Sequence, residues 1–568
     1  EVVKTLLSDG RVDPDRQDKY GRTALSWASQ NGDTEVVKTL LSDGRVEPDR
    51  QNNYGRTPLS WAAQNGHTEV VKALLSNGRV EPDRQNNYGR TALSWAAENG
   101  YTEVVKTLLS DSRVEPDRQD NYGRTPLSLA ARYGHTEVVK TLLSDGRVDP
   151  NRQDNYSQTP LSLAAQNGHT EVVKTLLSDG RVEPDRQDNY GQTPLSLAAE
   201  NGYTEVVKTL LSDGRLEPDR QDNIGRTALS WAAENGYTEV VKTLLSDGRV
   251  EPNRQDKYGR TPLSLAAENG YTEVVKTLLS DSRVEPDRQD NYGQTPLSWA
   301  AENGHTEVVK TLLSDGRVEP DRQDNYGPTA LSWAAQNGRT EVVKTLLSDS
   351  RVEPDRQDKY GRTALSLAAE NGYTEVVKTL LSDSRVDPDR QDDYGRTPLS
   401  LAARSGHTEV VKTLLRDSRV DPNRKDIYNQ RPLNWAIRNG HTEVVKTLLA
   451  NGRVDPDQQD NGQTLLGCAA DHGLSEIVRR SLLDDRSDPN PHEDSGQTLL
   501  FWASRMGHIE VVKTLLSDGR VHPDRQDKYG RTALNLAAEN GHTEVVKTLL
   551  SDGRVDPDRQ DKYGRTAL

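Results

Sequence analysis

Tyrosine and arginine side chains that could bind a partner recur along this chain at one fixed interval. Tyr122 and Arg124 flank a glycine, and the same Tyr-Gly-Arg pattern stands 34 residues earlier at Tyr88 and Arg90. Aromatic and guanidinium groups supply much of the binding energy at protein interfaces. The residues predicted to bind a partner are Tyr88, Arg90, Tyr122, Arg124, Arg132, Tyr156, Tyr190, Tyr258, Arg260, Tyr292, Tyr326, Tyr360 and Arg362.

A structural interpretation of the same residues stays open beside the binding one. If successive copies lie about 10 Å apart, neighbouring tyrosine rings are beyond the roughly 4.5–7 Å of direct pairing and do not stack continuously. Arginine can fill the gaps, because a guanidinium contacts a ring within about 6 Å. In the structural interpretation each tyrosine packs over its own loop, and the near-identical copies reflect tandem duplication alone.

The histidines and tryptophans also occupy repeated positions, which favours structural roles. Eight of the 11 histidines, among them His67, His135 and His169, stand at one turn, where other copies carry tyrosine or arginine. Copies about 10 Å apart cannot share a metal ion whose bonds are about 2 Å long. All eight tryptophans fall at one helical position where other copies have leucine, and this predicts half-buried packing.

No group of residues suited to catalysis stands out. The chain has no phosphate-binding glycine loop, no His-Glu-x-x-His zinc motif and no Gly-x-Ser-x-Gly nucleophile motif. The loop from Asp13 alternates carboxylates as a calcium loop does, but Gln17, Asp18 and Ala24 fall where that loop needs a ligand, a glycine and a glutamate. We therefore predict a protein that is not an enzyme and holds no metal or cofactor.

Composition excludes several further classes of protein. The chain has 568 residues, a formal net charge of −15 and one cysteine, Cys468. Its acidity disfavours nonspecific nucleic-acid binding, and a single cysteine excludes a disulfide framework. No apolar run approaches the ~20 residues of a membrane span. Because no signal or transit segment is visible, we expect an intracellular, cytoplasmic protein, with nuclear residence as an alternative.

All these positions belong to one sequence unit repeated through the chain. A threonine after Gly-Arg or Gly-Gln marks the same position of most copies, with 34 residues between copies and a single step of 33. Such self-similarity is typical of solenoids, whose repeats pack only on their neighbours. The predicted organisation is a partial repeat (1–20), twelve regular repeats (21–428), three divergent repeats (429–529), a regular repeat (530–563) and the start of another (564–568).

The first part of each repeat predicts a short helix. In the repeat from 123 to 156, Thr125 is suited to cap a helix and Pro126 to begin it, because proline's missing N–H costs nothing at the first helical position. Leucine and alanine follow, and Gly134 is expected to end the helix.

The second part of the repeat predicts another helix and then a loop. Thr136 is the expected N-cap, Val138 to Leu143 form an apolar stripe, and Gly146 is the expected stop. The residues from there to Tyr156 are rich in Asp, Pro, Asn and Gln, which predicts an extended loop with turns. We call this loop the finger.

This repeat resembles the ankyrin repeat. The matching residues are Asp120, Gly123, Thr125, Pro126, Leu127, Ala130, Ala131, Gly134, His135, Glu137, Val138, Val139, Leu142 and Leu143. The resemblance implies an all-α solenoid of about 16 complete helix-turn-helix repeats, joined by finger loops or β-hairpins. It also implies a protein-binding array whose concave side is formed by fingers and first helices. Two departures are Ser128 in place of the usual histidine and one extra residue per repeat.

Two alternative functions remain open at this stage. The array is a passive scaffold or spacer, or it senses a ligand for an NTPase switch domain. The second alternative rests on a resemblance of the repeats to arrays in fungal multidomain, NLR-like ankyrin proteins. The identity of the partner is not encoded in the repeated positions.

The block from 429 to 529 departs from the repeat pattern. Arg431 replaces the capping threonine, the tyrosine expected near 461 is missing, and Cys468, Phe501 and Met506 all lie in this block. The block is either decaying or specialised for a contact. Cys468 stands at the tryptophan/leucine position, which predicts a buried, unreactive thiol. We expect this block to open first in hydrogen exchange.

The two ends predict exposed apolar surface. Residues 1–20 supply a second helix without its first, which leaves Val2, Val3, Leu6 and Leu7 uncovered. Solenoids need polar caps for solubility, so we expect end-to-end self-association. Because the chain starts at Glu1 and not at methionine, we expect it to be a fragment.

Overall fold

A computed structural model describes residues 1–454, 465–482 and 497–568, and its backbone divides into two bodies, 1–291 and 292–568. The helices of the N-terminal body are α1 (Val2–Ser8), α2 (Ala24–Asn31), α3 (Thr34–Leu41), α4 (Pro58–Gln64), α5 (Thr68–Leu75), α6 (Ala92–Glu98), α7 (Thr102–Leu109), α8 (Pro126–Arg132), α9 (Thr136–Leu143), α10 (Pro160–Gln166), α11 (Thr170–Leu177), α12 (Pro194–Glu200), α13 (Thr204–Leu211), α14 (Ala228–Glu234), α15 (Thr238–Leu245), α16 (Pro262–Glu268) and α17 (Thr272–Leu279).

The C-terminal body continues the same alternation of first and second helices. Its helices are α18 (Pro296–Asn303), α19 (Thr306–Leu313), α20 (Ala330–Gln336), α21 (Thr340–Leu347), α22 (Ala364–Glu370), α23 (Thr374–Leu381), α24 (Pro398–Ser405), α25 (Thr408–Arg416), α26 (Pro432–Arg438), α27 (Thr442–Leu449), α28 (Leu465–Asp471), α29 (Ser475–Leu482), α30 (Leu499–Met506), α31 (Ile509–Leu516), α32 (Ala533–Glu539) and α33 (Thr543–Leu550).

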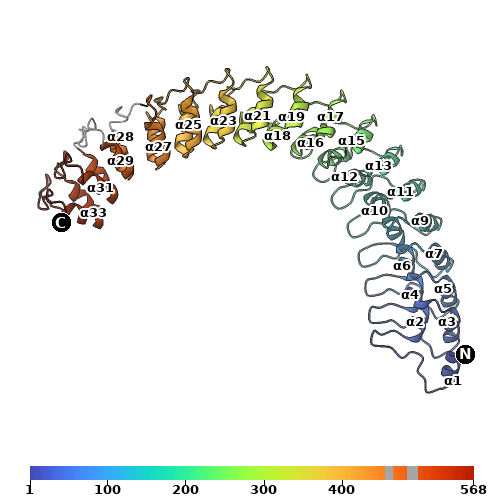
Figure 1. Ribbon diagram of the computed structural model, residues 1–568. Helices are drawn as coiled ribbons and strands as arrows, with labels where there is room; N and C mark the ends of the chain where they lie inside the picture. The colour runs from blue at the N-terminus through green and yellow to red at the C-terminus, as the bar shows by residue number, and fades with distance from the viewer. Residues whose placement is uncertain (455–464, 483–496) are drawn as a thin grey trace. The chain divides into compact units, whose positions relative to one another are not determined.

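Within each body the helices stand in two rows. In the N-terminal body α2, α4 and α6 pack side by side as first helices, while α3, α5 and α7 form the row of second helices, and the fingers project beyond the first helices (Figure 1). The described residues include helices and no strands, so the fingers are loops and not β-hairpins. The all-α solenoid predicted from the sequence is confirmed.

The first helix begins where the sequence predicts. Thr125 is the N-cap of α8, and its hydroxyl accepts the backbone N–H of Ser128 at 3.2 Å. Pro126 is the first helical residue. The Ser128 hydroxyl donates to the Thr125 carbonyl at 2.8 Å, so serine at the usual histidine position bonds locally within the cap. A side-chain cap of this kind is worth about 1 kcal/mol.

The second helix begins one residue earlier than the prediction. Thr136 is the first residue of α9 and not its N-cap; the N-cap is His135, which makes no side-chain capping bond. The reason is that the His135 carbonyl already accepts the Val139 N–H at 2.9 Å and so starts the helical ladder. The helix ends at Leu143, well before Gly146, and its C-cap is Ser144.

Each repeat buries its apolar stripe against its neighbours. Val138, Val139 and Leu142 of α9 are buried, as are Leu127 and Leu129 of α8. Burial of a valine or leucine side chain contributes about 1.5–3 kcal/mol. A repeat of two short helices cannot cover these side chains alone, so stacking is what makes the fold stable.

An arginine at the start of each finger bonds one repeat to the preceding one. Arg181 donates to the carbonyls of Val148 at 2.9 Å and Leu143 at 3.1 Å, and it pairs with Asp179 at 2.7 Å. This ion pair lowers the pKa of Asp179. Equivalent bonds to the preceding repeat are made by Arg45, Arg79, Arg113, Arg147, Arg215, Arg249, Arg283, Arg351, Arg385, Arg419, Arg453, Arg520 and Arg554.

A glutamine in most fingers bonds forward to the next repeat. The Gln119 Nε2 donates to the Gly123 carbonyl at 2.6 Å and to the Gln153 carbonyl at 2.8 Å. The first bond closes the finger on itself and the second joins it to the following finger. The fingers are therefore held in register along each body.

The divergent block retains the fold where the structure describes it. Arg431 is buried at the capping position, and the side chain of Asn434 accepts its backbone N–H at 3.1 Å. Cys468 is buried, as predicted. The missing tyrosine near 461 lies outside the described residues, and early opening of the block stays a prediction.

The N-terminal helix exposes apolar side chains, as predicted. Val2 is 74% exposed and Leu6 52%. Self-association through this surface stays a prediction. No helix among the described residues is long and apolar enough to cross a membrane.

Candidate binding surface

An aspartate, replaced by asparagine at 52 and 86, fixes the turn that presents the tyrosine. The Asp120 Oδ1 accepts the backbone N–H groups of Tyr122 and Arg124, both at 2.9 Å. Between them Gly123 has φ +77, a left-handed conformation that favours glycine. A Cβ there would lie 2.6 Å from the Asn155 Oδ1 of the next finger, so the close approach of the fingers also requires glycine.

Backbone bonds between fingers hold each tyrosine in place. The Asn155 N–H donates to the Tyr122 carbonyl, and the Asn155 Nδ2 donates to the Asn121 carbonyl, both at 3.0 Å. Where serine replaces the glycine, Ser157 keeps φ 61, and its hydroxyl donates to the Asn189 Oδ1 at 2.6 Å. The tyrosines therefore lie on fingers whose backbones are hydrogen-bonded to one another.

The predicted tyrosines stand at the exposed tips of the fingers. Each is between 49% and 66% exposed, and the eight are Tyr88, Tyr122, Tyr156, Tyr190, Tyr258, Tyr292, Tyr326 and Tyr360. This exposure leaves about half or more of each residue available for contact. It favours the binding interpretation over packing of the ring on its own finger.

Three of the predicted arginines lie against the tyrosines of their own repeats, whereas Arg90 lies against Trp95. The guanidinium of Arg124 is 4.6 Å from the centre of the Tyr122 ring, and that of Arg260 is 5.1 Å from the Tyr258 ring. Arg362 lies against its own tyrosine in the same way, at 5.1 Å. The expectation that guanidinium groups contact the rings is confirmed at these positions.

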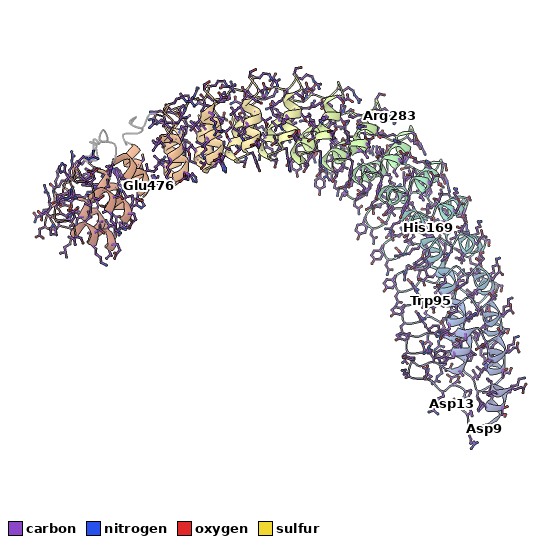
Figure 2. All side chains as sticks on the ribbon, in the orientation of Figure 1. Asp9, Asp13, Trp95, His169, Arg283 and Glu476 are labelled. Carbon is purple, nitrogen blue, oxygen red and sulfur yellow. The ribbon has the colours of Figure 1, made fainter. Side chains whose placement is uncertain are left out.

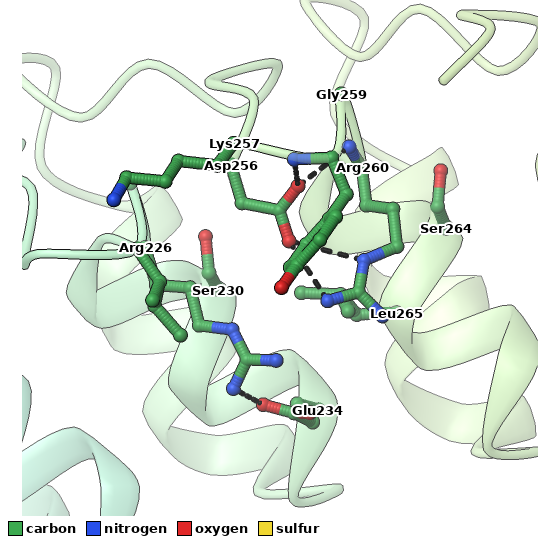
Figure 3. Close-up of polar contacts among 12 residues, drawn as sticks. Arg226, Ser230, Glu234, Asp256, Lys257, Gly259, Arg260, Ser264 and Leu265 are labelled. Atoms are coloured by element: carbon green, nitrogen blue, oxygen red, sulfur yellow. Dashed lines mark hydrogen bonds and ion pairs between the residues drawn. The ribbon is translucent and has the colours of Figure 1, made fainter. Parts of the chain in front are cut away.

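Most of these arginines are neutralised by acidic neighbours. Arg260 pairs with Asp256 at 3.0 Å and with Glu268 at 3.3 Å, and in the preceding repeat Arg226 pairs with Glu234 (Figure 3). Arg124 pairs with Asp120 at 2.8 Å, Arg362 with Asp358 at 2.9 Å, and Arg90 with Glu98. Most arginines that follow the finger glycine, which we call the arginine column, therefore form compensated ion pairs next to the exposed rings.

Some repeats keep the aspartate but lack the arginine. Gln158 and Gln192 replace the arginine, so Asp154 and Asp188 have no ion pair among the described residues. Burial raises the pKa of Asp154 against the bonds donated by Gln158 and Tyr156. Burial likewise raises the pKa of Asp188. The polarity of the surface thus changes from repeat to repeat although the tyrosines do not.

The turn histidines join neighbouring repeats, which agrees with the structural role predicted for them. The His169 Nε2 donates to the carbonyl of Arg132 at 2.9 Å, and the Arg132 side chain is exposed on α8. The same bond is made by His67, His135, His407, His441, His508 and His542. The described residues contain no group of three or more His, Cys, Asp or Glu side chains that could hold a metal ion.

The tryptophans are packed as predicted, with one exception. Trp95 is nearly buried in the row of first helices (Figure 2), and most of the others are half-buried. Trp27 is 40% exposed, because it lies in the first complete repeat and no first helix precedes it. Its Nε1 donates to Asp18 at 3.2 Å.

Sequence reasoning missed one pocket on the same face. It measures about 410 Å³ and is lined by Tyr20, Tyr54 and Tyr88 together with Arg56 and Trp61, among others. A signal existed in the sequence: the finger aspartate is replaced by asparagine in this repeat and the next.

Comparison with known families agrees with the geometry. A family model described as "Ankyrin repeats (3 copies)" matches residues 1–86, 78–154, 146–222, 214–290, 282–358, 350–426, 384–460 and 433–527, and one described as "Ankyrin repeats (many copies)" matches 515–568. No curated protein matches the chain significantly. Since these family models cover the whole sequence, and the described residues form repeated helix pairs and fingers, the chain belongs to the ankyrin repeat family.

Proposed function

We propose that this chain is a non-catalytic recognition array that binds a protein partner on the face formed by the finger tips and first helices. Ankyrin repeats are in general protein-interaction modules, and the partner here is still to be identified. The observation that carries the proposal is the row of half-exposed tyrosines on hydrogen-bonded fingers, such as Tyr122, Tyr156 and Tyr190. Rigid aromatic side chains give a large contact area for a small loss of conformational entropy.

The changing charge beneath the tyrosines supports recognition over a purely structural role. A spacer needs only length, so a spacer role does not explain why the charge differs between repeats. One repeat has Arg124 paired with Asp120, whereas the next has Asp154 without an arginine. Electrostatic complementarity of this kind selects among partners. The polar groups that repeat many times suit an extended surface and not a single active site, so the proposal includes no catalytic activity.

Substitution of Tyr122, Tyr156 and Tyr190 by alanine tests the proposal. Partners retained by the full chain are compared with those retained by the triple variant, and cross-linking locates the contact. The matched control replaces Lys140, Lys174 and Lys208, exposed on the second helices, by alanine. We expect the tyrosine variant to lose the partner and the lysine variant to keep it. Retention by both variants would support the spacer and contradict the proposal.

A further inference from the structure

The pocket around Arg56 differs from equivalent positions in its charge. In most repeats an acidic residue lies four positions before the arginine or eight positions after it. Around Arg56 these two positions are Asn52 and Gln64, both uncharged. The Gln64 Oε1 accepts a hydrogen bond from the Arg56 Nη1 at 2.8 Å. This bond gives one donor of the guanidinium a partner, but it does not neutralise the positive charge.

Arg56 is the one arginine of its column without an ion pair among the described residues. The others pair with Asp or Glu, and they are Arg22, Arg90, Arg124, Arg226, Arg260, Arg362, Arg396, Arg531 and Arg565. Glu234 neutralises Arg226 in Figure 3, whereas the Arg56 repeat has the uncharged Gln64 at the position equivalent to Glu234.

The guanidinium of Arg56 is held between two aromatic rings. It lies 4.5 Å from the centre of the Trp61 ring and 4.6 Å from that of Trp95. The side chain is half-buried, and burial together with the nearby charge of Arg90 lowers the pKa of Arg56. A partly desolvated cation without a counter-ion is costly, and an anion that reaches it relieves that cost.

The indole groups beside Arg56 also lack an acceptor. The Nε1 atoms of Trp61 and Trp95 are buried and unpartnered, whereas the Trp231 Nε1 donates to Asp222 at 3.1 Å. The difference lies in the finger residue, which is Asp222 in one repeat and Asn52 in the other.

The asparagine cannot replace the missing carboxylate. The Asn52 Oδ1 already accepts the backbone N–H groups of Tyr54 and Arg56, both at 2.9 Å. An amide offers one oxygen, and its other terminal atom is a donor. In the next repeat the Nδ2 of Asn86 is likewise buried without a partner. The unsatisfied donor of Trp61 and the uncompensated cation of Arg56 therefore belong to residues that line one pocket, and the unsatisfied indole of Trp95 lies next to Arg56.

We propose that this pocket binds the carboxylate of an aspartate or glutamate side chain of a protein partner, with Arg56 as the recognising residue. The proposal rests on the recognition function proposed above and names one of its contacts. A charge-assisted bond from a guanidinium to a carboxylate is stronger than a neutral hydrogen bond. The rings of Tyr20, Tyr54 and Tyr88 line the approach and contact the chain that carries the carboxylate.

The charge balance favours a carboxylate over a phosphate. A phosphate monoester carries about two negative charges at neutral pH. The pocket offers one uncompensated cation, because Arg22 is already paired with Asp18, and the whole chain has a net charge of −15. A singly charged group matches that single cation.

Peptide titration of the full chain tests the proposal. The probe is a seven-residue peptide with three central glutamates, acetylated and amidated at its ends, and the comparison peptide has glutamines in their place. Nitrogen-15 indole signals report on Trp61 and Trp95 and are assigned with Trp61→Phe and Trp95→Phe. We expect the glutamate peptide to shift these signals at concentrations where the glutamine peptide does not. Equal binding of both peptides, or stronger binding of a phosphoserine peptide, would overturn the proposal.

Asn52→Asp is the decisive variant, because it restores the carboxylate that other repeats have. The new side chain can neutralise Arg56 and accept from Trp61, so we expect affinity for the glutamate peptide to fall at least tenfold while the thermal midpoint does not fall. Asn53→Asp adds the same charge one residue away, on an exposed side chain, and should lower the affinity less than threefold. Equal effects of the two variants would show that the added negative charge merely repels the acidic peptide, and would overturn the proposal.

Two arginine variants separate this inference from the proposed function. Arg56→Gln should remove the preference for the glutamate peptide, and Arg226→Gln, at a compensated position, should keep it. The tyrosine triple variant described above is distant from the pocket and tests the array as a whole. Loss of the partner by the triple variant together with an unchanged peptide preference in Arg56→Gln would refute the pocket and leave the recognition function standing.

Discussion

The two carboxylate oxygens of Asp389 have unequal environments: the Oδ2 accepts the backbone N–H of Asp421 at 2.7 Å, whereas the Oδ1 is buried without a partner. The equivalent side chain elsewhere is sometimes asparagine. Asn423 keeps the finger position, and its Nδ2 donates to the Arg453 carbonyl, thirty residues on, at 2.7 Å. The aspartate has no N–H group at this position, so it cannot make the bond to a backbone carbonyl that the asparagine makes.

Replacement of Asp389 by asparagine should strengthen its junction at neutral pH. The amide can donate to the Arg419 carbonyl, the counterpart of the Arg453 carbonyl beside Asn423, and one such bond contributes about 1 kcal/mol. We expect the Asp421 amide to exchange about fivefold more slowly at pH 8 in the variant. Native-state hydrogen exchange measures this, and an unchanged or faster rate would contradict the role of the orphan oxygen.

The pH dependence of the same junction follows from the raised pKa of Asp389. Burial raises this pKa from 3.8 to about 6, with a further rise from the charge of Asp421 and an opposing effect of Arg424. The folded state therefore binds the proton more tightly than the unfolded state, so its stabilisation is complete below about pH 4 and is lost as the pH rises through 6. We expect protection of the Asp421 amide, corrected for intrinsic exchange, to fall over that range. The Glu183 amide, bonded to Asn151, is the control and should not follow it.

Replacement of Arg181 by methionine should open the junction between two repeats. The variant loses donors to the Val148 and Leu143 carbonyls, and charged hydrogen bonds contribute about 1.5–3 kcal/mol each. We expect a local loss of about 2–3 kcal/mol in exchange stability at this junction. Lys174→Met breaks only the exposed pair with Glu171 and should cost below about 0.5 kcal/mol. Similar losses in both variants would show that the bridging bonds contribute little.

Gly134→Ala should destabilise its repeat more than an exposed substitution does. Gly134 has φ +80, and a Cβ there would lie 2.7 Å from the His169 Nδ1. A non-glycine residue in the left-handed region costs on the order of 1 kcal/mol or more before any clash. We expect a loss of 2–3 kcal/mol in denaturant unfolding. A smaller control change is expected for Gly146→Ala, since no atom lies within 4 Å of that Cβ.

His169→Tyr should be tolerated where His169→Ala is not. The imidazole bond to the Arg132 carbonyl is lost in the alanine variant, which should cost about 1 kcal/mol. The next repeat already has Tyr203 at this turn, with its ring against Gly168 as His169 lies against Gly134. Thermal unfolding of both variants measures the difference, and equal losses would show that the ring's packing is unimportant.

Much of the fold could be predicted from the sequence because it depends on local chemistry. Thr125 and Pro126 mark the start of a helix by capping rules, and the valines and leucines after Thr136 mark the buried face. The error at Thr136 arose because a threonine before a glutamate looks like a cap. The structure instead uses the His135 backbone without a side-chain bond.

The bonds between repeats could not be predicted in the same way. Gln119 and Arg181 resemble ordinary polar loop residues in the sequence, and their acceptors in the neighbouring repeats lie 33 to 38 residues away. Only the register of stacked fingers brings them together. The exposure of Tyr122 and the missing counter-ion of Arg56 depend on that register too, so the candidate surface was predicted in part and its pocket was not.

The sameness of the junctions has a consequence for how such a gene can change. Arg147 bonds to the carbonyls of Val114 and Leu109, just as Arg181 bonds to those of Val148 and Leu143. Excision of one whole copy would therefore bring Arg181 to acceptors of the same kind, and duplication would create one more such junction. Recombination between copies can lengthen or shorten this protein in steps of 34 residues without requiring a new interface to evolve.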